Sequence, residues 1–217
     1  MTQSIDLKDL ERKVFRSTFQ DGLWDIFLGL MLFAMAVGAL LSDLGMAHLS
    51  TMLIFSGIVA LALAVIWAGK RFIIAPRMGL VQFGPEGTSR QKKTRWLLSL
   101  SLLFGTAIFI FTLVARNTRL EWLNPALFLG GIYTANMLIV FSLGAYFLNF
   151  TRLYLIGVMY AIPVPLDIIF HELADIDITA VAVGAPAVAV LLIGIVLFVR
   201  FLREYPLPVT EVYDAGE

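Results

Sequence analysis

Two groups of ionisable residues stand beside long apolar stretches, and they are the places where the chain could carry out chemistry. The first group is Asp21 and Asp25, which are four positions apart and would share one face of a helix. The second is the segment 165–177, in which Asp167, His171 and Asp175 are also spaced by four. A charged side chain inside hydrocarbon costs roughly 2.5–3.5 kcal/mol on insertion scales, so a residue of this kind is a functional candidate by default.

We expect Asp25 to lie in the first turn of an apolar helix, on the side of the membrane where several arginines gather. The favoured interpretation is an ion pair with Arg71, Arg95 or Arg152, because opposite charge compensates a carboxylate that leaves water. An ion or proton site at Asp25, or simple exposure of its side chain to water, are the alternatives.

The second group is a candidate ion or proton site made of Asp167, His171, Glu172 and Asp175. Oxygen and imidazole groups on one helix face can bind a divalent cation, although one helix cannot complete the coordination sphere. The H-E-x-x-H zinc motif is not matched, because Asp175 stands four positions after His171. The favoured interpretation is an amphipathic external segment with its acids in water. A metal or proton site, with His48 as a further ligand, and a catalytic site are the alternatives; any metal or cofactor is unknown.

The composition explains why these charges stand out. Hydrophobic residues make up 59% of the 217 positions and charged residues only 15%, against roughly 45–50% and about 25% in soluble domains. Between short clusters of charge the chain is almost uncharged for about 20 residues at a time, the length of a membrane-crossing helix. We therefore predict an all-α membrane protein, a bundle of six transmembrane helices within 23–199. The predicted spans are 23–41, 51–68, 96–115, 126–148, 153–170 and 178–199.

The charge distribution predicts the orientation of these spans. With six spans and a cytoplasmic N-terminus, fourteen of the 16 basic residues lie inside and only Arg116 and Arg119 lie outside. Such a bias is typical of the cytoplasmic side, so both termini are predicted in the cytoplasm of a cell-membrane protein. The fifth span is the least certain, because Pro163 and Pro165 each remove a backbone donor, and a break at Ile162 would leave two short pieces.

Little of the chain lies outside the predicted spans. Residues 1–22 fit an amphipathic helix lying along the inner leaflet, as a membrane anchor or, alternatively, a partner-binding segment. In the basic loop 70–95, two apolar runs flank the turn-like stretch 76–79, which predicts a short interfacial hairpin followed by a polar linker. Residues 200–217 form a cytoplasmic tail. The predicted contacts with anionic lipid headgroups are Lys70, Arg71, Arg77, Lys92, Lys93 and Arg95.

Several classes of protein are excluded or disfavoured. Without cysteine there is no disulfide, thiolate metal site or cysteine nucleophile. A nucleic-acid partner is not expected, because the formal net charge is zero and no RNA-binding or helix-turn-helix pattern is present. No Walker-type glycine loop supports an ATP-driven pump. Asn136, near the middle of the fourth span, needs a partner for its amide, and an interhelical hydrogen bond is the default expectation.

Two short motifs carry a resemblance. The stretch F-Q-D-G-L-W-D-I-F-L-G-L at 19–30 is followed by P-R-M-G-L-V-Q-F at 76–83. Together they resemble a group of uncharacterised prokaryotic integral membrane proteins, in which an aspartate-bearing first span precedes a P-R-x-G-x-V loop. The resemblance covers roughly the first 85 residues. It implies a prokaryotic membrane location and brings no activity with it.

Three functional classes follow from these observations. The favoured class is a non-enzymatic structural, regulatory or accessory subunit, because the spans are poor in polar groups and the loops are short. Such a subunit can form a homo-oligomer. A small transporter or channel is the alternative, with a site near the proline-broken fifth span. A metal-dependent membrane enzyme that uses the external Asp/His/Glu cluster is the third.

Overall fold

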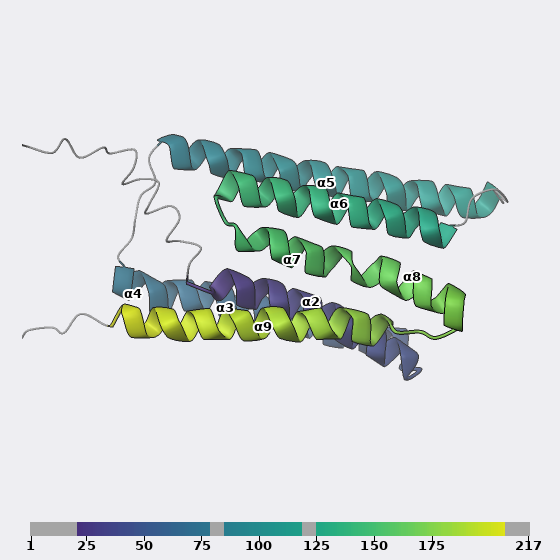
Figure 1. Cartoon of the computed structure of the whole chain (residues 1–217), viewed down its shortest axis with the longest axis horizontal. Helices are drawn as coiled ribbons and strands as arrows, with labels where there is room; N and C mark the ends of the chain where they lie inside the picture. The colour runs from purple at the N-terminus through teal and green to yellow at the C-terminus, as the bar shows by residue number, and fades with distance from the viewer. Residues whose placement is uncertain (1–20, 79–84, 119–124, 207–217) are drawn as a thin grey trace, which may run out of the picture.

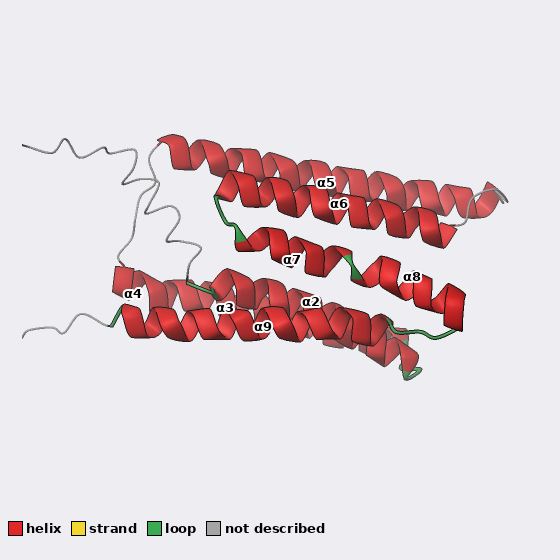
Figure 2. Cartoon of the chain, in the orientation of Figure 1, coloured by secondary structure: helices red, strands yellow, loops and turns green. Residues whose placement is uncertain are grey.

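The computed structural model describes residues 21–78, 85–118 and 125–206, and every regular element in these ranges is a helix (Figure 2). The helices are α2 (Leu23–Asp43), α3 (His48–Ala68), the π-helix η1 (Gly69–Ile74), α4 (Ala75–Met78), α5 (Pro85–Thr118), α6 (Pro125–Leu148), α7 (Arg152–Ala161), α8 (Pro163–Ala174) and α9 (Thr179–Glu204).

Within the described ranges, five helical segments are long and apolar enough to cross a membrane, which fits a multi-pass membrane protein. They are Leu23–Asp43, His48–Arg77, Leu127–Leu148, Arg152–Ala174 and Thr179–Glu204. At 1.5 Å per residue, the 21 residues of α2 extend about 31 Å, close to the thickness of a hydrocarbon core. The predicted third span lies inside α5, whose described apolar section, Arg95–Ile108, is shorter than these five.

The helices run side by side along one long axis, and the chain reverses at two ends (Figure 1). Neighbours follow the order α5, α6, α7 with α8, α9, α2 and α3. One end holds the start of α2, the end of α4, the start of α5, the α6–α7 turn and the end of α9 (Figure 1). We call it the basic end, because it carries Lys70, Arg71, Arg77, Lys92, Lys93, Arg95, Arg152, Arg200 and Arg203. The opposite end holds the α2–α3 turn and the loop 175–178.

Glycines allow α2 and α9 to pack with their backbones close together. A Cβ at Gly194 would lie 2.7 Å from the Ile26 nitrogen, and one at Gly29 would lie 2.8 Å from Leu191 Cγ. In a membrane, close approach of this kind replaces the hydrophobic driving force as a source of packing energy. The adjoining core cluster contains Leu32, Ala36, Ile156, Tyr160, Val183, Ala187 and Val190.

The predicted fifth span is a kinked pair of helices. Ile162 separates α7 from α8 but keeps helical dihedrals, and its N–H donates to the Val158 carbonyl at 3.0 Å. Pro165 has no N–H for the Ala161 carbonyl, four residues earlier. The Thr134 hydroxyl of α6 lies 3.3 Å from that carbonyl and 2.8 Å from the Gly130 carbonyl of its own helix. The Tyr133 hydroxyl donates to the neighbouring Tyr160 carbonyl at 3.2 Å. Hydroxyl groups of the neighbouring helix thus lie beside the carbonyls at the interruption. Taken together, α7 and α8 are long and apolar enough to span a membrane.

The prediction of a hairpin in the loop 70–95 is wrong for the part that the structure describes. Residues 71–78 continue the second span as π-helix and then α-helix, and residues 86–95, predicted as a polar linker, lie in the first turns of α5. The wide π turns come directly before Pro76, and such turns relieve the clash of a proline ring with the preceding helix turn. Residues 79–84, which include the second arm of that hairpin, and the predicted amphipathic segment up to residue 20 lie outside the described residues.

Candidate functional site at the basic end

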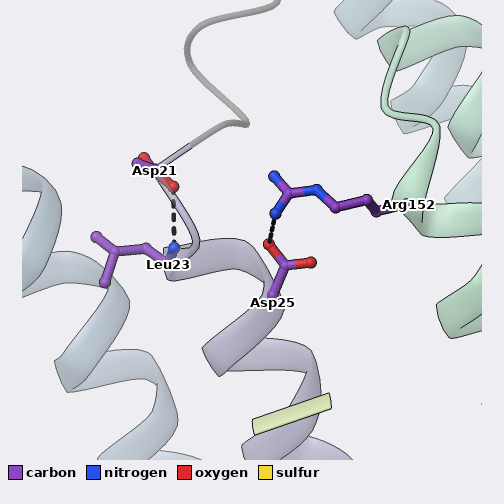
Figure 3. Close-up of polar contacts among 4 residues, drawn as sticks. All are labelled: Asp21, Leu23, Asp25 and Arg152. Carbon is purple, nitrogen blue, oxygen red and sulfur yellow. Dashed lines mark hydrogen bonds and ion pairs between the residues drawn. The ribbon is translucent and has the colours of Figure 1, made fainter. Parts of the chain in front are cut away.

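The start of α2 is shaped by a glycine with a left-handed backbone. Gly22 has φ 77°, which other residues rarely adopt, and it places Asp21 before the helix. The prediction that Asp21 and Asp25 share one helix face is therefore wrong. Asp21 is 1% exposed, and its Oδ1 accepts a hydrogen bond from the Leu23 N–H at 2.9 Å (Figure 3). Burial raises the pKa of Asp21, while the nearby charge of Lys70 opposes that shift.

The Asp25 side chain points away from Asp21, toward α7 (Figure 3). Its Oδ2 lies 3.2 Å from Nη1 of Arg152, and the carboxylate is 1% exposed whereas the arginine side chain is 30% exposed. Arg152 is one of the three arginines considered as partners from the sequence. Because Arg152 is the first residue of α7, this ion pair ties α2 to α7 across the basic end of the bundle.

Further contacts hold α2 against the end of the second span. Gly69 packs so closely on Leu23 that a Cβ there would lie 2.6 Å from Leu23 Cδ1. The next residue, Lys70, places its Nζ 5.1 Å from the centre of the Trp24 ring, a cation–π geometry. Lys70 thus lies near the Asp21 carboxylate, and Arg152 pairs with Asp25.

Arg77 connects α4 to the end of α9. Its Nη1 donates to the carbonyls of Leu202, at 3.1 Å, and Tyr205, at 2.8 Å. The last carbonyls of a helix lack partners within the helix, and the negative end of its dipole attracts cations. Arg77 thus serves as a cap for α9, a role that differs from the headgroup contact predicted from the sequence.

The other basic residues predicted to contact headgroups lie around this site. Arg71 is exposed and lies over the Trp67 ring at 5.7 Å, whereas Lys70 is half-buried. Lys92, Lys93 and Arg95 are exposed along the first turns of α5. The structure therefore divides the group into residues that contact other helices and residues whose charge faces outward.

An apolar groove of about 510 Å³ opens beside the ion pair, between α2 and α5, with α6 and α7 as its floor. Its lining residues are Trp24, Phe27, Leu28, Arg95, Leu97, Leu98, Val140, Phe141, Gly144, Leu148, Phe150 and Leu153. Among these Arg95 alone carries a charge.

A second cavity of about 440 Å³ lies near the α6–α7 turn and is lined by Lys93, Ala145, Tyr146, Phe147, Asn149, Thr151 and Tyr154.

The Asp/His/Glu segment lies at the opposite end of the bundle and is not one continuous stripe. Asp167 is half-buried and accepts a hydrogen bond from the Ile178 N–H at 3.2 Å, whereas His171, Glu172 and Asp175 are exposed. Asp175 lies beyond α8 with φ 53°, so the expectation that it continues the helix face of Asp167 and His171 is wrong. A hydrogen bond from Thr179 N–H lowers the pKa of exposed Asp177.

His48, considered as a further ligand, is exposed at the start of α3, at the same end as this segment. Over the residues that the structure describes, no group of three or more histidine, cysteine, aspartate or glutamate side chains is placed to hold a metal ion. An ion or proton site in this segment stays a prediction.

Polar contacts inside the spans join helices in pairs. The prediction of an interhelical hydrogen bond at Asn136 is confirmed, since its side-chain amide lies 3.3 Å from the Ser101 hydroxyl of α5. Tyr160 was not anticipated from the sequence: its buried hydroxyl donates to the Leu28 carbonyl at 2.6 Å, a second tie between α7 and α2. A tyrosine in a span is one signal that could have drawn attention to it, because a buried phenol needs a partner.

Comparison of the chain with protein-family models, curated proteins and solved structures finds no match. The resemblance carried by residues 19–30 and 76–83 therefore stays a prediction. The structure does give both motifs contacts at the same end of the bundle, through Asp21 and Asp25 in the first and Arg77 in the second.

Proposed function

We propose that the chain is a six-span protein of the cell membrane, with its basic end and both termini in the cytoplasm. In this proposal it has no enzymatic activity and acts as a structural, regulatory or accessory subunit. Its lipid-facing basic residues contact anionic headgroups of the inner leaflet.

The charge asymmetry of the bundle supports this orientation. The basic end carries the lysines and arginines named above, whereas acidic side chains such as Asp43, Glu172, Asp175 and Asp177 occur at the opposite end. Cytoplasmic loops are enriched in Lys and Arg. We propose α5 as the sixth crossing, because it runs alongside the whole of α6 (Figure 1).

The single observation that carries the accessory role is the Asp25–Arg152 ion pair. The most buried carboxylate within a span is engaged in holding two helices together, and Asn136 and Asp167 also bond within the bundle. None of these three residues lines either of the two cavities described above. A transport path would instead present such groups to a water-filled cavity.

Self-association is part of the proposal. Among the described residues of α3, Ala62 alone is buried, and a Cβ at Gly57 would meet nothing within 4 Å. A second copy could pack on this face of small and apolar residues. Cysteine cross-linking in the native membrane through Gly57→Cys should give a dimer, and Val181→Cys, at an exposed position of α9, is the matched control.

A transporter or channel is the second candidate, favoured by the interruption of the fifth span at Ile162. The donors that Tyr133 and Thr134 supply at this interruption favour a closed, structural kink over an ion site.

A flux measurement on the purified protein in sealed vesicles tests the choice. With proton-, sodium- and potassium-sensitive dyes, we expect the same leak as in protein-free vesicles, and no change with Asp25→Asn. A flux well above that leak, abolished by Asp25→Asn and retained by the control Asp43→Asn, would replace the accessory role with transport.

A further inference from the structure

The groove between α2 and α5 has the size and chemistry of a binding site. Its volume of about 510 Å³ falls within the range of roughly 300–1,000 Å³ that small-molecule sites occupy. Aromatic and aliphatic side chains line it, among them Trp24 and Phe27 of α2 and Leu98 of α5. An apolar, elongated ligand would fit such a groove.

The charge at the groove is positive. Arg95 is its charged lining residue, and Lys92 and Lys93 are exposed on the preceding turn of α5. Asp25 lies nearby, but Arg152 compensates its carboxylate at 3.2 Å. A ligand with an anionic group at the basic end of an apolar body matches this arrangement.

The length of the groove matches one leaflet of a bilayer. Its lining residues on α6 run from Val140 to Leu148, eight helical steps or about 12 Å along the axis. Half of a hydrocarbon core is about 15 Å thick. The groove thus begins near Arg95 and Trp24 and extends through most of the leaflet on the basic side.

We infer that this groove binds one anionic phospholipid, with an acyl chain along α6 and the phosphate at Arg95. The inference rests on the proposed membrane orientation, and it turns a general attraction to anionic lipid into one defined site. A lipid bound here would contact α2, α5, α6 and α7 at once. It would fill the space between α2 and α5 and so stabilise the arrangement in which these two helices are apart. Phosphatidylcholine, with no net charge, should bind less tightly than phosphatidylglycerol of the same chain length.

Quenching of Trp24 by lipid with brominated acyl chains tests the inference. In the full-length protein, Trp67, Trp96 and Trp122 are replaced by phenylalanine, so that Trp24 is the remaining tryptophan. This protein is reconstituted in phosphatidylcholine vesicles that contain an increasing mole fraction of brominated phosphatidylglycerol. We expect half-maximal quenching at a roughly fivefold lower fraction than with brominated phosphatidylcholine, and Arg95→Gln should remove this preference. Arg203→Gln removes an exposed charge at the same end but outside the groove, and it should preserve the preference.

A second pair of variants tests the apolar part. Val140→Phe fills the groove and should reduce quenching by both lipids, whereas Val196→Phe on the exposed face of α9 should not. Equal preference for the two lipids, equal losses in Arg95→Gln and Arg203→Gln, or unchanged quenching in Val140→Phe would overturn the inference. So would a Trp24 that no lipid quenches, since a protein segment or a second copy would then cover the groove. Flux through the protein would refute the accessory role but leave these lipid measurements unaffected.

Discussion

The Asp25 carboxylate lies 3.2 Å from the Arg152 guanidinium, although Asp25 is in the first predicted span and Arg152 directly precedes the fifth. The pair is asymmetric, since the carboxylate is almost fully buried and the arginine is 30% exposed. It closes the basic end of the bundle, while the Tyr160–Leu28 hydrogen bond joins the same two helices farther along. Together these two polar contacts join α7 to α2, whereas α7 packs mainly against α6.

The asymmetry predicts unequal effects of removing each partner. Arg152→Gln leaves a buried anion and should lower the free energy of unfolding by about 3 kcal/mol, whereas Asp25→Asn should lower it by only about 1 kcal/mol. In the double variant the loss should approach that of Asp25→Asn alone. Unfolding by SDS titration measures these values, and Arg203→Gln is the control. Additive losses in the double variant would contradict the pairing.

The close packing of α2 on α9 predicts a strong effect of a single methyl group. Gly194→Ala should lower the free energy of unfolding by about 1–3 kcal/mol, because the new Cβ would meet the backbone of Ile26 and force the helices apart. Gly105→Ala makes the same change in α5, where a Cβ meets nothing within 4 Å, and should be neutral or slightly stabilising. Equal losses in the two variants would show that the α2–α9 contact is looser than described.

The kink between α7 and α8 predicts a coupling between Thr134 and Pro165. Thr134→Val removes the hydroxyl near the Ala161 carbonyl and should cost about 0.5–1.5 kcal/mol. Pro165→Ala restores a backbone N–H for that carbonyl, so Thr134→Val should cost less in the Pro165→Ala background. A thermodynamic cycle of the four proteins measures the coupling. The same cost in both backgrounds would mean that the threonine does not compensate for the proline.

Asp21 predicts a pH dependence of stability. Because burial raises its pKa above the ordinary value of 3.8, the folded protein holds this proton more tightly than the unfolded chain does. The contribution of Asp21 to stability therefore falls as the pH rises from about the ordinary value through the raised one. Asp21→Asn keeps an oxygen for the Leu23 N–H and should remove this fall, which unfolding at a series of pH values measures. Asp43→Asn, an exposed residue at the opposite end, is the control, and an unchanged pH profile in Asp21→Asn would contradict the prediction.

The sequence predicts most of the helices because hydropathy and span length are local properties. The sequence also proposes three arginines as partners of Asp25, since the predicted topology places all three on the same side of the membrane as Asp25. The choice of Arg152 depends on which helices are neighbours in space, and no local pattern determines that. The same holds for Arg77, whose acceptors are carbonyls more than one hundred residues away.

Other features were missed for physical reasons. Gly22 has a left-handed backbone and α2 begins only after it, so Asp21 lies outside the helix and spacing by four did not place the two aspartates on one face. Pro76 suggested a turn, but the π-helical turns before it let the second span continue. The groove arises from the separation of α2 and α5, a property of the packed bundle rather than of either helix.

The most direct test of the account is the sidedness of its two ends in the cell membrane. The chain has no cysteine, so Ala47→Cys at the opposite end and Thr151→Cys at the basic end each provide one reactive thiol at an exposed position. With a membrane-impermeant maleimide, Ala47→Cys should react in intact cells, and Thr151→Cys should react only after the membrane is opened. Labelling of Thr151→Cys in intact cells, or of both sites from the same side, would contradict the proposed membrane protein with a cytoplasmic basic end.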